Sequence, residues 1–130
     1  MRIVFEIEGW SKNPEENADL IRSLVTGLAK VNYAILSRGG FPFLYDSGIF
    51  YQAEPPGVET WLDVVGCLRK GATDCNNLVA WRIAELWRSK VDAQPVVSYE
   101  PNEHGGYTYH VFIATEHGTE DPSVRLGMLG

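Results

Sequence analysis

The chain has 130 residues, 45% of them hydrophobic and 22% charged, which is typical of one folded domain with a core of its own. Eleven basic and 17 acidic residues give a net charge of −6, which argues against nucleic acid as a partner because phosphate binding needs a basic surface. No apolar run reaches membrane-spanning length, and acids interrupt the short apolar start, so we expect no membrane segment and no signal peptide.

The first forty residues predict a strand and then a long helix. Apolar and acidic residues alternate over residues 2–8, which predicts a half-buried strand. Asn13 is a favourable N-cap, Pro14 suits the first helical position, and Glu16 stands where a capping box needs it. The glycines of residues 38–40 end the helix. Its apolar stripe consists of Leu20, Ile21, Leu24, Val25, Leu28, Val31 and Ile35.

Residues 41–58 are predicted to form a long loop rich in Pro, Gly and aromatic residues, with a short strand over residues 50–52. A loop of this length in a small domain is often functional. The alternative is that its aromatic side chains fill the core.

Two helices are predicted next. The first runs from about Glu59 to Lys70 and ends at Gly71. The second is capped by Thr73 or Asp74, and its buried face follows helical spacing. That face consists of Cys75, Leu78, Val79, Arg82, Ile83 and Leu86, flanked by Trp81 and Trp87. Cys75 thus lies at a helix N-terminus, where backbone N–H groups lower the pKa of a thiol.

The last third predicts strands. Residues 93–100 and 107–115 are rich in β-branched and aromatic residues, and His110 lies in the second of these strands. A tight turn is predicted at residues 117–118, followed by a return strand that Pro122 ends. The tail from residue 123 onward is expected to be irregular.

Three residues could form a cysteine-nucleophile site. Cys75 would attack a carbonyl carbon, His110 would act as acid and base, and Asp121 would orient His110. The backbone N–H of Cys75 would be one oxyanion donor. Candidates for the second donor are Gln52 and Trp61, with Tyr45 and Tyr51 as further ones.

Each of these residues also has an ordinary structural explanation. A single cysteine is more often a small buried apolar group, a strand histidine can be a hydrogen-bonded core residue, and an Asp before Pro often forms a turn. Metal binding is the rival chemistry, with Cys75, His104, His110 and His117 as ligands. The paired spacing of zinc sites is absent from the sequence, so we expect no metal and no cofactor. The only two cysteines, Cys67 and Cys75, are expected to be reduced thiols.

The motifs themselves carry a family resemblance. Thr73-Asp74-Cys75 with Trp81, Tyr109-His110-Val111 and Glu120-Asp121-Pro122-Ser123 resemble the transglutaminase-like branch of the papain-like cysteine superfamily. The ending Asp-Pro-Ser followed by Leu126-Gly127-Met128 is similar to small members encoded by bacteriophages and prophages. The resemblance covers residues 59–128.

The resemblance implies a single α+β domain over residues 1–130, with helices packed on a small antiparallel sheet and the Cys75 helix against the His110 strand. The sequence departs from the family at Thr73, where the family usually has Gly. The predicted turn at residues 117–118 also places Asp121 opposite Ala114 or Ile113, so contact with His110 would need a bulge.

The resemblance also implies an activity: hydrolysis or acyl transfer at an amide or isopeptide bond, through a thioester on Cys75. Protease, amidase and transglutaminase activities share the same triad and are not separated by the sequence. The alternative is a non-catalytic structural or assembly protein of a phage particle that retains the fold. A third hypothesis is an effector that deamidates a host glutamine. We expect a protein or peptide substrate, with other phage structural proteins as further partners, and a location in the host cytoplasm or the virion.

Overall fold

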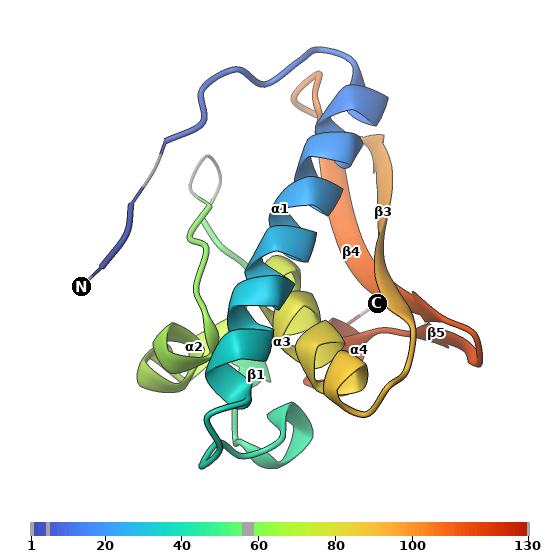
Figure 1. Cartoon of the computed structure of the whole chain (residues 1–130). Coiled ribbons are helices and arrows are strands. Elements are labelled where there is room, and N and C mark those ends of the chain that lie inside the picture. Colours follow the sequence, from blue (N-terminus) through green and yellow to red (C-terminus); the bar gives the residue numbers. More distant parts are fainter. Residues whose placement is uncertain (1, 5, 56–58, 130) are drawn as a thin grey trace.

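Helix α3 (Cys75–Arg88) lies in the middle of the molecule, with α1 (Pro14–Leu36) on one side and a three-stranded sheet on another (Figure 1). The computed structural model describes residues 2–4, 6–55 and 59–129. The remaining elements are η1 (Leu44–Asp46), β1 (Phe50–Tyr51), α2 (Val64–Lys70), β2 (Ala72–Thr73), β3 (Ala93–Pro101), β4 (Tyr107–Thr115), β5 (Gly118–Glu120) and α4 (Pro122–Arg125).

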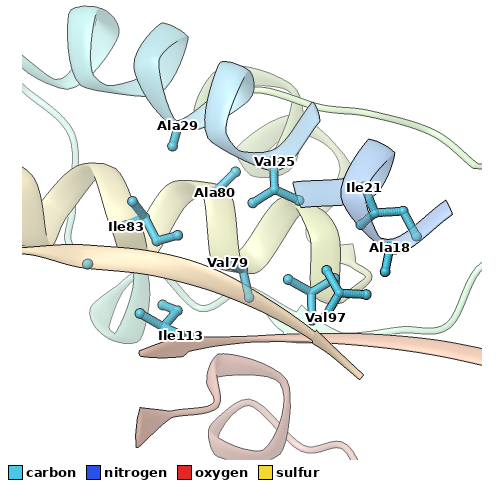
Figure 2. Packing of buried hydrophobic residues seen from close by; sticks show 11 residues of the cluster. Ala18, Ile21, Val25, Ala29, Val79, Ala80, Ile83, Val97 and Ile113 are labelled. Carbon is cyan, nitrogen blue, oxygen red and sulfur yellow. The ribbon is translucent and has the colours of Figure 1, made fainter. Parts of the chain in front are cut away.

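Two hydrophobic clusters meet at α3. The sheet-side core joins α1, α3, β3 and β4, and Figure 2 shows its side chains converging from the two helices and the strands. It consists of Ala18, Ile21, Val25, Ala29, Val79, Ala80, Ile83, Ala93, Val97, Val111 and Ile113. The loop-side core lies on the other side of α3 and consists of Leu36, Leu44, Ile49, Val64, Cys67, Leu78, Trp81 and Ala84.

This arrangement corrects the prediction of a single buried face on the third helix. Leu78 and Trp81 are both fully buried on the loop side, while Val79 and Ile83 are fully buried on the sheet side. Helix α3 also buries polar side chains, among them Asn77 and Glu85, which are satisfied by hydrogen bonds to neighbouring segments. A single apolar stripe is typical of a helix that packs on one side only, whereas α3 is covered on several sides.

The larger sheet is antiparallel with the order β3-β4-β5, and the strand bounds agree closely with the prediction. Val111 and Ile113, two positions apart and therefore on one face of β4, are fully buried in the core. A second, two-stranded sheet pairs β1 with β2 in parallel, so that Tyr51 lies beside Thr73.

The start of the chain differs from the prediction. The described residues within 2–8 form no strand, and both Ile3 and Val4 are largely exposed. Phe5, part of the predicted alternation, lies outside the described residues. A strand is stable only when its backbone groups pair with a neighbour, and alternation does not supply one.

Helix α1 begins where predicted and has the predicted N-cap, but it lacks the predicted capping box. Asn13 Oδ1 accepts from Glu15 N at 2.9 Å, as an N-cap should. The Asn13 backbone N–H donates to Ser11 Oγ at 2.9 Å, so the reciprocal capping box with Glu16 is not formed. Gly39 and Gly40 follow the helix with positive φ angles of 80° and 88°.

Helix α2 begins five residues later than predicted. Its N-cap is Asp63, whose Oδ1 accepts from Gly66 N at 2.8 Å. Gly71 ends it in the left-handed conformation at φ 85°, as predicted. Pro56, Gly57 and Val58 lie outside the described residues.

The aromatic loop mainly serves the core. Phe41, Tyr45 and Tyr51 pack against the loop-side core, and Leu44 and Ile49 are buried in it. Phe43 and Phe50 remain exposed. The core-filling alternative is therefore confirmed for part of the loop.

The tail from residue 123 onward was expected to be irregular, and this prediction is wrong for residues 123–125. Pro122 opens the short helix α4, with Asp121 as its N-cap. The α+β class, with helices packed on a small antiparallel sheet, is confirmed. None of the helices in the described residues is long and apolar enough to cross a membrane.

Candidate active site

Cys75 is the first residue of α3 and is half-buried. The parallel pair β1–β2 delivers the chain to this point, and Asp74 occupies the N-cap. Cys75 Sγ lies 3.8 Å from Asn76 Oδ1, and both Cys67 and Cys75 are free thiols. The predicted position of the cysteine at a helix start is therefore confirmed.

The expected lowering of the thiol pKa is not found. Burial and the neighbouring Asp74 carboxylate raise the pKa of Cys75 to about 12, while hydrogen bonding to the backbone of Val111 opposes the rise. Desolvation and a nearby negative charge both disfavour a thiolate. At this helix start the two effects outweigh the backbone N–H groups.

A pair of carboxyl groups lies next to the thiol. Asp74 is buried, and its Oδ1 has no hydrogen-bond partner among the described residues. Burial, followed by the charge of Glu59, raises the pKa of Asp74 to about 7. Glu59 as a residue is exposed, yet its carboxyl group is partly buried, and this burial raises the pKa of Glu59. Two carboxyl groups can hydrogen-bond each other only when one carries a proton, so the pair is expected to hold one near neutral pH.

His110 and Asp121 are brought together. His110 Nε2 lies 2.7 Å from Asp121 Oδ2, and both side chains are about 70% buried. The other oxygen of Asp121 accepts from Ser123 N at 3.1 Å and from Val124 N at 3.4 Å. The cap of α4 therefore fixes the carboxylate that binds the imidazole.

The strand register explains how this contact forms without the predicted bulge. Ile113 pairs with Glu120 and Thr115 with Gly118, so the hairpin tip is Glu116-His117, one residue earlier than predicted. Continuing this register by one residue places Asp121 across from Phe112. His110 and Phe112 share one face of β4, so Asp121 and His110 are diagonal neighbours on that face.

Cys75 and His110 lie on neighbouring elements. The thiol contacts the backbone of Val111, the residue after His110 in β4. Within the described residues the Cys75 sulfur forms no hydrogen bond with the imidazole. Because Asp121 engages Nε2, Nδ1 is the ring nitrogen left to interact with a thiol.

The four candidates for the second oxyanion donor lie in different environments. Tyr45 uses its hydroxyl to donate to Glu120, and Gln52 is exposed. Trp61 packs against the sheet-side core, as Cys75 does. Tyr51 pairs with Thr73, two residues before Cys75, and burial followed by the charges of Cys75, Asp74 and Asp121 raises the pKa of Tyr51.

The remaining histidines lie away from this site. His104 is exposed in the loop after β3, and His117 is exposed at the hairpin tip, 3.8 Å from Glu116. Among the residues that the structure describes, no three His, Cys, Asp or Glu side chains converge as metal ligands.

Comparisons with known proteins give little further information. No family model matches the chain, and no curated protein matches it. Among solved structures, it is similar to the periplasmic domain of TgpA from Pseudomonas aeruginosa, crystallised bound to ethylmercury. The sequences are 20% identical, the TM-score is 0.40, and the match covers 85% of this chain and 45% of that chain. At that degree of overlap the likeness carries no argument about this chain.

Proposed function

We propose that the chain is a transglutaminase-like, cysteine-dependent hydrolase or acyltransferase that acts on amide or isopeptide bonds through a Cys75 thioester. The observation that carries the proposal is the distance of 2.7 Å between His110 Nε2 and Asp121 Oδ2. His110 lies in β4, and the residue after it, Val111, contacts the Cys75 thiol through its backbone. A thiol, an imidazole and a carboxylate in this order are the parts of an acyl-transfer site. The resemblance of the surrounding motifs to the transglutaminase-like family supports the same chemistry.

The proposed reaction has two halves. In the first, His110 Nδ1 takes the thiol proton while Cys75 Sγ attacks the amide carbonyl carbon, and the imidazolium then protonates the departing amine. In the second, water or an amine attacks the thioester, His110 removes the attacker's proton, and the thiol is restored as the acyl product leaves. Asp121 Oδ2 holds the imidazole, while the Cys75 N–H and the Tyr51 hydroxyl would stabilise the oxyanion.

A second candidate function is favoured by one specific observation. The raised pKa of Cys75, about 12, describes a thiol that is not activated in the resting molecule. A non-catalytic structural or assembly protein that retains the fold, such as a component of a phage particle, would tolerate such a thiol. The catalytic proposal includes a protein or peptide substrate. Both proposals include a phage-related protein that is located in the host cytoplasm or in the virion.

Thiol labelling distinguishes the two candidates. A thiol with a pKa of about 12 is roughly 10⁻⁵ ionised at pH 7, whereas a free cysteine is a few per cent ionised, so an idle Cys75 should react far more slowly than a free thiol. If His110 activates it, iodoacetamide should modify Cys75 faster than free cysteine, and His110→Ala should abolish the difference. Peptide mapping separates Cys75 from the fully buried Cys67, which serves as an unreactive internal control. Labelling of Cys75 no faster than that of a free thiol would sink the catalytic proposal.

A further inference from the structure

Glu120, the last residue of β5, lies one position before Asp121 and is held by two side chains. Glu120 Oε2 accepts from the Tyr45 hydroxyl at 2.5 Å and from Arg82 Nε at 2.6 Å. Its partners come from η1 and from α3, which are distant in sequence from β5. The end of β5 is thus tied to the body of the molecule.

The Arg82 side chain is itself anchored in buried structure. Arg82 Nη1 donates to Glu85 Oε1 at 3.2 Å, and Glu85 is only 5% exposed. Glu85 Oε2 in turn accepts from Leu44 N at 2.7 Å and from Trp81 Nε1 at 3.0 Å. A carboxylate with several donors is a strong, well-oriented hydrogen-bonding group, so Arg82 has a defined position.

The other side of Asp121 is tied to the same tyrosine. The Arg82 guanidinium lies 5.0 Å from the centroid of the Tyr45 ring, and the Arg125 guanidinium lies 4.1 Å from it. Arg125 ends α4, the helix that Asp121 caps. Residues 120 and 125 therefore both contact Tyr45, one before and one after the carboxylate that binds His110.

The cap of α4 orients the Asp121 carboxylate, but the strand pairing holds the backbone before it only weakly. β5 has only three residues in register with β4, and it follows an exposed hairpin tip. A pairing this short frays readily unless side chains secure it. The Asp121 carboxylate must nevertheless stay within 2.7 Å of His110 Nε2 to fix the ring.

We propose that Glu120, clamped by Tyr45 and Arg82, is a positioning residue that holds Asp121 against His110 and so sets the orientation of the imidazole. This inference rests on the proposed function for its catalytic meaning, since an oriented imidazole matters only if Cys75 uses it. The positioning of Asp121 depends only on the contacts of Glu120 with Tyr45 and Arg82 and not on the activity of Cys75. It assigns a role to Tyr45 different from the oxyanion donor that the sequence suggested.

The test uses the full chain and two conservative variants, Tyr45→Phe and Glu120→Gln. Tyr45→Phe removes one hydroxyl and keeps the ring beneath the two guanidinium groups, whereas Glu120→Gln removes the charge and keeps the shape. We expect both to weaken the hydrogen-bonded His110 ring N–H signal in the NMR spectrum and to mix the two imidazole tautomers. Alkylation of Cys75 should slow about tenfold, as expected for a displaced catalytic group.

Tyr99→Phe is the matched control, because it removes another Tyr–Glu hydrogen bond, from Tyr99 to Glu15 at 2.8 Å, outside the clamp. The exposed His104 and His117 provide reference signals in the same spectra. If Tyr45→Phe and Glu120→Gln both fold and change the His110 ring N–H signal no more than Tyr99→Phe does, the positioning role of Glu120 is overturned. If the signal changes but Cys75 is no more reactive than a free thiol in the wild type, the positioning role holds and the proposed function fails.

Discussion

At the scale of single residues, Asp74 controls the charge at the start of α3. The residue is 6% exposed, and its Oδ1 lacks a hydrogen-bond partner within the described residues. Its charge acts on both Glu59 and Cys75. When ionised it opposes the thiolate, and when protonated it does not. The protonation state of Asp74 therefore affects both the fold and the candidate nucleophile.

Asp74 should make the protein less stable as the pH rises toward neutrality. Its pKa is 3.8 in a model peptide and about 7 in the fold, so the folded state binds the proton more tightly than the unfolded state. The stabilisation is complete below pH 4, is lost progressively from about pH 4 to 7, and amounts at most to about 4 kcal/mol. Asp74→Asn, which keeps a good N-cap residue, should flatten this fall when the free energy of unfolding in urea is compared at pH 5 and pH 8.

Asp46→Asn is a suitable control, since Asp46 is exposed and does not contribute to the pKa shifts of Asp74 and Glu59. It should leave the pH dependence as in the wild type. A fall in stability that persists unchanged in Asp74→Asn would show that other groups cause it.

The sequence predicted some of these residues and missed others for a definite reason. Cys75 and the Asp121 cap are signalled locally, by a helix start and by the Asp-Pro pair, and His110 by its place in a clear strand. The pairing of Asp74 with Glu59, fifteen positions apart, depends on how the segment before α2 folds back, and no local pattern reports that. The raised pKa of Cys75 follows first from burial by segments distant in sequence and then from the adjacent Asp74 carboxylate.

At the scale of elements, buried asparagines join segments that have little regular structure. Asn77, fully buried on α3, accepts from Leu62 N at 2.9 Å and donates to Thr60 O and Thr73 Oγ1, both at 2.8 Å. It thereby fixes the approach to α2 and the strand β2 at once. Amide side chains suit this task because they donate and accept together.

Replacing Asn77 should cost more than removing an ordinary helix cap. Asn77→Leu leaves the buried Thr73 hydroxyl without this partner, together with the partly buried groups Leu62 N–H and Thr60 C=O, so we expect a loss of about 3 kcal/mol in the free energy of unfolding. Asp63→Ala, which removes the cap of α2, should cost about 1 kcal/mol. Urea titration of both variants measures the difference, and equal losses would contradict the role given to Asn77.

The elements themselves were predicted unevenly. The ends of α1, β3 and β4 follow from caps, glycines and alternation, which are local. The absent N-terminal strand was mispredicted because a strand needs a pairing partner, which no local pattern reports. The start of α2 and the short α4 were mispredicted although their caps, Asp63 and Asp121, are local signals. The hairpin turn was predicted one residue too late, and this error shifts the partner of Asp121 from Ala114 or Ile113 to Phe112.

At the scale of the whole molecule, the two cores share one helix. Leu78 belongs to the loop-side core and Val79 to the sheet-side core, yet they are consecutive residues of α3. Neither core can lose its packing without loosening the helix that supports the other. The molecule should therefore unfold as one cooperative unit.

Truncating either residue should lower the same transition. We expect Leu78→Ala to cost about 3 kcal/mol and Val79→Ala about 2 kcal/mol, from lost burial and the cavities left behind. Tryptophan fluorescence, to which the buried Trp81 of the loop-side core contributes, and far-UV circular dichroism should give coincident urea curves for both variants. Separate transitions for the two signals in Leu78→Ala would mean that the cores unfold independently.

The burial of α3 on several sides also limits how this chain can change over evolutionary time. Nine of its 14 residues are buried. Its N-cap, Asp74, and its first residue, Cys75, belong to the candidate active site, so few positions of this helix accept substitution freely. The turns at residues 102–106 and 116–117 are largely exposed and face no such limit. Distant relatives should therefore be recognised best by the run from Asp74 to Trp81, and divergence in what they act on should be sought in the surface turns.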